Sequence, residues 1–390
     1  MEEDGSIDFD ILERELSERG VIPYAERPIS TMVQIATFEG SLNLAIVFEM
    51  LPITLTQVTK KIRSKKKFQL EWHPVPGSIL NSSYEDQHVG VVNSTKKPMK
   101  YSIALVMSIS DKNITCKLYN NKLHMSGCKS LDHGRETVWH ILNHLSRIKR
   151  ILDWINANRE TAQSVINMVS DAVLDEAQVY TEEKVFDGTQ YILSSEYPGI
   201  IQGPPVLPRE LQPVPADQVE FVDYLLFMRQ RFVNHVLLKR KYNSLLDIAH
   251  AVATTNPMVT GSFECKNIVS NMMNHNYSLG FKVNREALNS IINGEHGFTS
   301  SFIHEMHPAV QIGLGYDTAL RTGVTLDGKI VHIPWTNSKK KKKEDHRHTF
   351  TVWYTGQVTQ SGPEPALCRE AYLLFMKIVT DYEEMIRAES

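Results

Sequence analysis

The chain has 390 residues, 42% of them apolar and 22% charged, so it is long and apolar enough to build one large or two medium hydrophobic cores. Its formal net charge of −3 at pH 7 excludes attachment to nucleic acid through a bulk positive field, so any such binding must depend on local basic patches or on shape. The four cysteines lack C-x-x-C spacing, which excludes a disulfide framework and indicates a reducing compartment.

The first elements follow an acidic N-terminal segment, residues 1–28. This segment has no apolar run behind a positive stretch, so we expect no signal peptide, and no later stretch predicts a membrane span. A strand is expected over 29–38. Apolar residues then recur at helical spacing over 42–51, and a proline ends the run.

A meander of strands and a long helix complete the first half. Asn120-Asn121 is typical of a hairpin turn and separates expected strands at 113–119 and 122–127. From Leu131 apolar residues recur at helical spacing as far as 154–158. This pattern predicts a helix long enough to lie across a sheet.

The middle of the chain has a different texture. A helix is expected over 161–176, and a proline-rich strap at 198–215 excludes regular structure. Strongly apolar helical patterns resume over 220–242 and 245–252. We therefore interpret residues 159–255 as a helical insert between two domains, 29–158 and 256–390. The last domain is expected to hold a helix at 285–293, an inserted hairpin at 322–335 and a final helix from Pro365.

The two outer domains repeat each other at a nearly constant offset. The matching pairs are Leu118-Tyr119 with Trp353-Tyr354, Ser126-Gly127 with Ser361-Gly362, Arg135-Glu136 with Arg369-Glu370, and Met32-Val33 with Met258-Val259. Because the order is the same in both halves, we expect two copies of one unit that lie side by side as a pseudo-twofold saddle. Such an architecture is typical of a protein that binds something long and roughly symmetric.

Two pairs of segments carry a resemblance to a known family. They are STMVQIATFEGSLNL with YNNKLHMSGCKS in the first half, and PMVTGSFECK with WYTGQVTQSGPE in the second. Both pairs resemble the first strand and the glycine turn of TATA-box-binding proteins, and the first half resembles in particular the divergent members of large DNA viruses. The resemblance implies an α+β fold in which two pseudo-symmetric repeats form a curved antiparallel sheet, a saddle, with long helices on its convex side and an inserted helical segment.

The resemblance also implies a function and a site. The concave face would enter the DNA minor groove, insert apolar wedges and bend the duplex. One wedge of each repeat would fall on Leu118 and Trp353, and the other on Val75 and His307, each before a proline. The DNA-binding residues implied in this way are Val33, Val75, Leu118, Lys122, His124, Ser126, Lys129, Val259, Trp353, Thr359 and Ser361.

The chain departs from the family pattern at several of these positions. The central asparagine of the first strand is replaced by Thr31 in the first repeat and by Pro257 in the second. The basic positions Lys122 and Lys129 of the first repeat have Gln357 and Glu364 as counterparts, so phosphate contact is expected to be lopsided.

The sequence does not decide which face of the strand at 113–119 turns to the core. Ile114, Cys116 and Leu118 alternate with polar residues, so this apolar face can turn either to the core or to DNA, and a slip of one residue exchanges the two faces. In the second repeat, Phe350, Val352 and Tyr354 predict a core face that leaves Thr351 and Trp353 outside.

No catalytic pattern stands above background. The sequence has no glycine-rich phosphate loop, nucleophile elbow or paired-carboxylate spacing, so we expect no enzyme and no small-molecule substrate. The histidines near 304–307 and 346–348 do not have metal-site spacing, so we expect no metal and no cofactor. The lysine runs at 60–67 and 339–343 are typical of solvated loops, of phosphate contacts or of a nuclear localisation patch.

Two functions remain open at this stage. The first is a TATA-binding-protein-like initiation factor whose partners are double-stranded DNA and general transcription factors or RNA polymerase subunits, with no membrane, in the nucleus, a cytoplasmic viral factory or a virion. The second is a saddle-fold interaction or structural module of a large DNA virus that has lost DNA binding. The missing asparagine favours the second function, and the apolar wedge positions favour the first.

Overall fold

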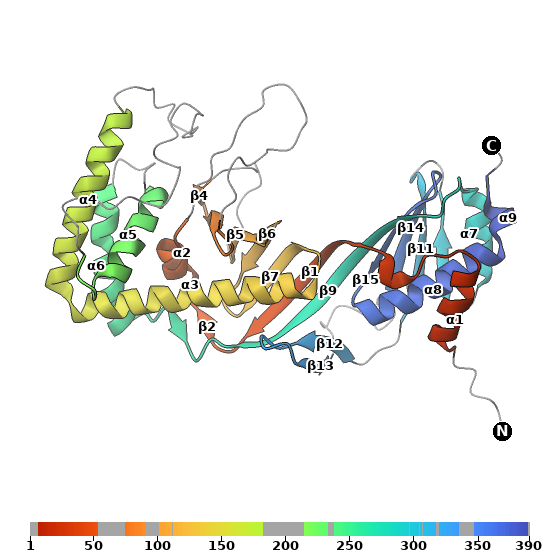
Figure 1. The fold of residues 1–390 in the computed structure, drawn as a ribbon, viewed down its shortest axis with the longest axis horizontal. Coiled ribbons are helices and arrows are strands. Elements are labelled where there is room, and N and C mark those ends of the chain that lie inside the picture. The colour runs from red at the N-terminus through yellow and green to blue at the C-terminus, as the bar shows by residue number, and fades with distance from the viewer. Residues whose placement is uncertain are drawn as a thin grey trace. The chain divides into compact units, whose positions relative to one another are not determined.

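The computed structural model of the chain describes residues 7–53, 75–90, 101–110, 112–181, 214–232, 238–295, 297–303, 305, 307–316, 320–334 and 347–388. The fold is α+β with a large antiparallel sheet, as the sequence predicts (Figure 1). The chain divides into two compact units, one of residues 1–35, 126–134 and 267–390 and one of residues 36–125 and 135–266. Among the described helices, none has the length and apolar character needed to cross a membrane.

The first repeat begins with a strand, continues with a short helix and a meander, and ends with a long helix. Its strands stand in the order β1-β7-β6-β5-β3-β4. The bounds are β1 Ile29–Phe38, α2 Leu44–Met50, β3 Ile79–Tyr84, β4 Gln87–Gly90, β5 Ile103–Ile109, β6 Lys112–Leu118, β7 Lys122–Cys128 and α3 Leu131–Ala157. Alternate residues of β6 and β7 are buried, so each strand gives one face to the core.

The second repeat has the same plan. Its strands stand in the order β9-β15-β14-β11-β10, and every neighbouring pair is antiparallel. The bounds are β9 Cys265–Ser278, α7 Arg285–Gly294, β10 Phe298–Ser301, β11 Ala309–Gly315, β14 Arg347–Trp353, β15 Gln357–Gly362 and α8 Pro365–Asp381. This order matches β1-β7-β6-β5-β3 strand for strand, which confirms the predicted repeat. The predicted hairpin is β12 Leu320–Val324 with β13 Ile330–Pro334, and β12 pairs with β9 through Gly323 and Val269.

The start of the second repeat differs from the prediction. Val259 and Thr260 form the short strand β8, which pairs with β2, Ser41–Leu42, in a separate two-stranded sheet. The first strand of the repeat is β9, which begins at Cys265. The apparent match between Met32-Val33 and Met258-Val259 is therefore wrong, and Pro257 does not stand at the position assigned to the family asparagine.

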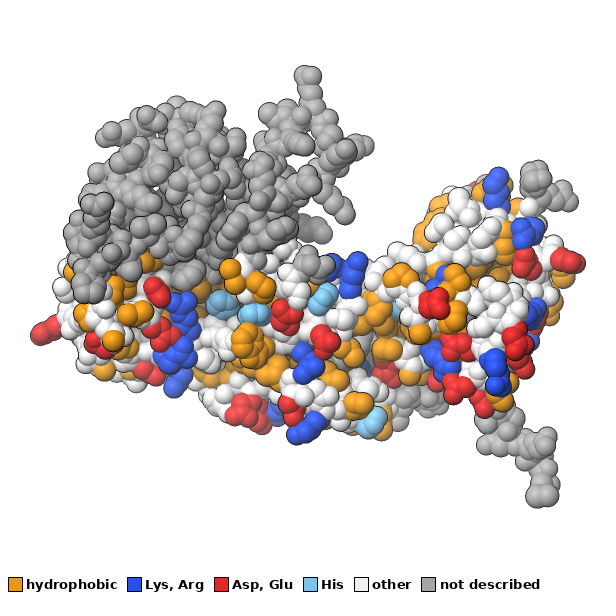
Figure 2. All heavy atoms as spheres, viewed as in Figure 1, with side chains coloured by type: hydrophobic (Ala, Val, Ile, Leu, Met, Phe, Trp, Pro, Cys, Tyr) orange, Lys and Arg blue, Asp and Glu red, His pale blue; other side chains and the backbone are white. Residues whose placement is uncertain are grey.

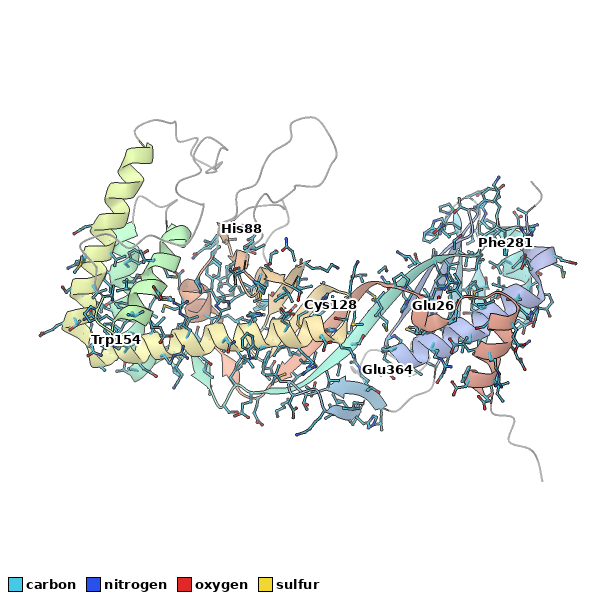
Figure 3. The ribbon with its side chains drawn as sticks, viewed as in Figure 1. Glu26, His88, Cys128, Trp154, Phe281 and Glu364 are labelled. Atoms are coloured by element: carbon cyan, nitrogen blue, oxygen red, sulfur yellow. The ribbon has the colours of Figure 1, made fainter. Side chains whose placement is uncertain are left out.

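Three helices lie between the repeats: α4 Arg159–Thr181, α5 Val219–Phe232 and α6 Leu238–Thr254. They pack on one another and on the first repeat. Trp154 of α3 (Figure 3) packs on Phe221 with ring centroids 4.8 Å apart, and the Tyr224 hydroxyl donates to the Met50 carbonyl at 2.8 Å. The predicted strap at 198–215, apart from its last two residues, and both lysine runs lie outside the described residues.

The acidic N-terminal segment contains a helix that the sequence patterns did not predict. Helix α1, Phe9–Glu18, begins at Asp8, whose carboxylate accepts from the backbone N–H groups of residues 10 and 11. It packs on α8, where Arg369 contacts carboxylate oxygens of Asp10 and Glu13, each at 2.6 Å. A 3-10 turn, Tyr24–Glu26, follows α1, and α9, Glu383–Ile386, follows α8.

Candidate nucleic-acid interface

The sheet of the second repeat has one face in the core and one face open. Phe350 and Val352 have no exposed surface, and Phe350 stacks on Phe375 of α8 with ring centroids 4.5 Å apart. The side chains between them point the other way and are half-buried or exposed. We call this second set the open face of the second repeat; it consists of Asn274, Asn276, Gln311, Arg347, Thr349, Thr351, Trp353, Gln357, Thr359 and Ser361.

A row of polar side chains crosses four strands of this open face. Strand pairing places Thr351 opposite both Gln311 and Thr359, and Thr359 opposite Asn276. The Thr351 hydroxyl donates to Gln311 Oε1 at 3.1 Å, and the Thr359 hydroxyl donates to Asn276 Oδ1 at 2.9 Å. In the next row, Ser361 donates to an amide oxygen in the same way.

These hydrogen bonds orient the amides. Ser361 Oγ donates to Asn274 Oδ1 at 2.7 Å, so both asparagines hold their oxygens toward a hydroxyl. The two asparagine amides then keep their N–H groups for an outside acceptor, whereas Gln311 Nε2 lies 3.3 Å from His307 Nδ1. The floor of the minor groove at A·T pairs presents acceptors, adenine N3 and thymine O2. The row therefore offers the complementary donors, and it includes the predicted residues Thr359 and Ser361.

The first repeat presents a basic open face. Lys122 is exposed at the start of β7, and His124 and Lys117 are half-buried on the sheet side away from the buried residues of β6 and β7. Burial lowers the pKa of His124, and the nearby Lys117 ammonium lowers that pKa further. The imidazole is therefore mainly neutral at pH 7, beside a permanent positive charge.

The predicted wedge at Leu118 is wrong. Leu118 is 0% exposed and belongs to the core face of β6 with Ile114 and Cys116. Of the two facings that the alternation left open, the structure has the one that turns these residues inward. An apolar side chain with no exposed surface cannot insert between base pairs.

A difference in hairpin loop length explains the error. In the second repeat Val352 pairs with Val358, which puts Trp353 opposite the first residue of β15 and leaves three loop residues, 354–356. In the first repeat the Tyr119 N–H donates to the Lys122 carbonyl at 2.8 Å, which leaves only two, Asn120 and Asn121. The counterpart of Trp353 is therefore Tyr119, and both side chains are half-buried.

Three of the remaining predicted residues lie on the large sheet or directly after it, and one does not. Val33 is half-buried between the buried Met32 and Gln34 of β1, on the opposite side of the strand, and Ser126 is half-buried on β7. Lys129 is exposed after β7. Val259 lies outside the large sheet on β8, so its prediction as a DNA-binding residue of that sheet is corrected.

The second pair of wedge positions is not equivalent in the two repeats. Val75 is 68% exposed, but it precedes β3, the second strand of its repeat, whereas His307 precedes β11, the third strand. The counterpart of β11 in the first repeat is β5, and the residue two positions before β5 is Tyr101, which is 80% exposed. Val75 and His307 are each followed by a proline, so the two positions look equivalent in the sequence although they precede strands that do not correspond.

The second repeat has cations that the sequence comparison missed. Gln357 is exposed, and Glu364, at the start of α8 (Figure 3), is buried and accepts from the Thr322 N–H at 2.8 Å. At the end of the repeat the Arg285 guanidinium lies 4.8 Å from the Phe302 ring centroid, and Lys282 Nζ lies 5.9 Å from that of Tyr354. The loop after β9 and the start of α7 therefore contribute positive charge to this repeat, in addition to Arg347, which is exposed on β14.

Charge is otherwise mixed over the surface. On the face that Figure 2 presents, lysine and arginine side chains are interspersed with aspartate and glutamate. Within the described part of the chain, no group of three or more histidine, cysteine, aspartate or glutamate residues is placed to hold a metal ion.

Comparisons with known proteins show similarity to solved structures. No family model and no curated protein matches the chain. Among solved structures, the chain is similar to Methanococcus jannaschii TBP, with 10% sequence identity over 91% of this chain and 99% of that chain and a TM-score of 0.32.

Proposed function

We propose that the chain is a transcription initiation factor that binds A·T-rich promoter DNA through the minor groove and bends it. The observation that supports this proposal best is the row of amides and hydroxyls across the open face of the second repeat. Its donors suit the acceptors of the minor groove at A·T pairs. The half-buried aromatic residues Tyr119 and Trp353, at the ends of matching strands, suit the wedges that unstack base steps.

The proposal assigns two kinds of contact. The lysines of the first repeat attract the phosphate backbone, which gives affinity without sequence preference. The neutral row of the second repeat contacts base edges. Unstacking costs a few kcal/mol per step, so A·T-rich sequences that deform easily bind better. In this proposal the helices present a surface to general transcription factors or polymerase subunits.

A duplex shift assay tests the proposal. The full chain is mixed with A·T-rich and G·C-rich duplexes of equal length at low and moderate salt. We expect a preference for the A·T-rich duplex, and we expect Thr359→Val to reduce that preference about tenfold, in line with the worth of a good base contact. Thr380→Val is the matched control, because Thr380 donates to a carbonyl within α8, at Met376.

One observation favours a second function. The open-face hydroxyls of the second repeat already donate to amides of the same face, and the residues of the row carry no charge. A sheet face whose polar side chains already hydrogen-bond to one another also suits a protein-interaction or structural module. If no duplex shifts at any salt concentration, the interaction module replaces the DNA-binding proposal.

A further inference from the structure

The unit of residues 36–125 and 135–266 contains a pocket of about 440 Å³, a volume in the range of small-ligand sites. Three chain segments that lie far apart in the sequence form its wall: 41–45, Asn120 and 256–260. Tyr84 and Tyr101 complete the lining. The pocket therefore adjoins the hairpin turn that carries Tyr119.

Backbone hydrogen bonds hold the wall segments together. The Leu42 N–H donates to the Asn120 carbonyl at 2.8 Å, and the Asn43 N–H donates to the Met258 carbonyl at 2.9 Å. Ser41 also pairs with Thr260 in the two-stranded sheet. Because strand pairing and turn contacts fix the wall, the pocket is a formed feature of the fold.

The amides of the wall are partly fixed and partly free to bind. Asn43 Nδ2 donates to Asn256 Oδ1 at 2.7 Å, and Asn43 Oδ1 accepts from the Ile46 N–H at 3.3 Å. This arrangement leaves the N–H groups of Asn256 for a ligand. The side-chain amide of Asn120 has no hydrogen bond to another residue in the described part of the chain, and it offers both a donor and an acceptor.

The chemistry of the lining narrows the ligand class. None of the described lining residues is charged, so a phosphate group or a metal ion would find no counter-charge there. Tyr101 is 80% exposed and offers a flat ring. Tyr84 packs against Phe48 with ring centroids 5.7 Å apart, which restricts the position of its ring. Flat aromatic rings beside amide donors and acceptors are the groups that recognise nucleobases.

We propose that this pocket binds a nucleobase, which stacks on Tyr101 and hydrogen-bonds to the amides of Asn120 and Asn256. The base can come from two sources, a free nucleotide or a base extruded from DNA. The second source rests on the proposed function, because the unstacking residue Tyr119 immediately precedes Asn120 in the chain. A base displaced at that step would have a neutral, amide-lined pocket beside it.

Two binding experiments on the full chain distinguish the sources. In the first, adenosine monophosphate is titrated and its binding is followed by saturation-transfer NMR. In the second, an A·T-rich duplex with one unpaired adenine is compared with the fully paired duplex. Tyr101→Ala is expected to weaken binding to the responsive probe about tenfold, and Tyr101→Phe to retain it, since stacking needs the ring and not the hydroxyl. Trp139→Ala removes a similarly exposed ring outside the pocket and is the control.

Each result has a defined meaning. Binding of adenosine monophosphate that depends on Tyr101 supports a free nucleotide, and a Tyr101-dependent preference for the unpaired adenine supports an extruded base. If neither probe responds to Tyr101→Ala or Asn120→Ala, the nucleobase pocket is refuted. If neither duplex binds, the proposed function fails while the nucleotide titration still decides on the pocket.

Discussion

On the open face of the second repeat a row of neutral amides and hydroxyls lies beside an exposed cation, Arg347, whereas on the first the strands present Lys117, Lys122 and the imidazole of His124. Both faces stand on the same strand order, so the fold does not dictate their chemistry. The basic face suits phosphates, which are the same in every DNA sequence, and the neutral row suits base edges, which differ between sequences. The comparison teaches that two sheets with the same strand order can present different chemistry, and under the proposed function affinity and specificity would be divided between them.

The largest expected effect concerns the hairpin loop that sets the two repeats apart. Gly356 has φ +78°, and a Cβ atom there would lie 2.0 Å from the Phe281 carbonyl oxygen. Gly356→Ala is expected to lower the free energy of unfolding by about 3 kcal/mol, because left-handed strain and backbone displacement add. Urea denaturation measures the change.

A neighbouring glycine provides the control for that experiment. Gly280 has φ +87° but no atom within 4 Å of a Cβ, so Gly280→Ala is expected to cost only the strain, about 1 kcal/mol. Equal losses in the two variants would show that the close approach to Phe281 does not matter.

The second effect tests the basic face. If Lys117, Lys122 and Lys129 contact phosphates, their replacement by glutamine removes about 2.7 from the log–log salt slope of DNA binding. Between 50 and 200 mM salt, the triple variant should then lose about 40-fold less affinity than the parent chain. Fluorescence anisotropy at several salt concentrations measures the slope.

A substitution in the neutral row of the second repeat is the comparison for the lysine variant. Thr359→Val should leave the salt slope unchanged and reduce only the preference for A·T-rich duplexes. A slope that stays the same in the lysine variant would contradict the proposed division between the repeats.

The third effect compares the aromatic ends of the two faces. Tyr119→Ala and Trp353→Ala are each expected to weaken DNA binding about tenfold, because each removes a wedge. Leu118→Ala should act differently. It empties a core position and should lower the free energy of unfolding by about 2–5 kcal/mol, measured by urea denaturation.

A different pattern of results would restore the other assignment. If Leu118→Ala left stability unchanged and weakened DNA binding while Tyr119→Ala did neither, then Leu118, rather than Tyr119, would be the counterpart of Trp353.

The smallest effect is a pH dependence confined to the first repeat. The pKa of His124 lies below its usual 6.5, so the imidazole is neutral at pH 7 and gains a positive charge as the pH falls. Phosphate favours the charged form, so DNA affinity should rise about threefold between pH 7 and pH 5. His124→Gln should flatten this rise. Anisotropy titrations across that range, with Lys117 intact, measure the difference.

Much of the fold follows from local patterns. The alternation over 29–38 predicts β1 with the bounds that it has, and the apolar spacing after Leu131 predicts α3. Pro365 marks the start of α8 because proline suits the first turn of a helix. The paired motifs Arg135-Glu136 and Arg369-Glu370 both fall in the second turn of the helix that closes a repeat.

The sequence pattern does not predict strand β9, because the core face of this strand is not purely apolar. His275 is buried between Met273 and Tyr277, and its Nε2 lies 2.9 Å from the hydroxyl of Tyr24. Burial lowers the pKa of His275, so the neutral ring suits the core. A polar residue at an inward position hides the two-residue period, and its partner lies 251 residues away in the chain.

The sequence pattern does not predict helix α1 for a related reason. Its stability depends on packing against α8 and on Arg369, which contacts Asp10 and Glu13. In the sequence this segment is recognisable only as acidic, because the contacts that stabilise the helix come from α8, at the other end of the chain.

The sequence by itself determined the duplicated plan of this protein, because the spacing of apolar residues and the order of turns are local properties of the chain. Only the tertiary structure decided which side chains reach the open faces. One loop residue fewer between β6 and β7 turns Leu118 inward and gives Tyr119 the place that Trp353 has in the other repeat. Facing is set by strand pairing, and pairing depends on contacts that no local pattern contains.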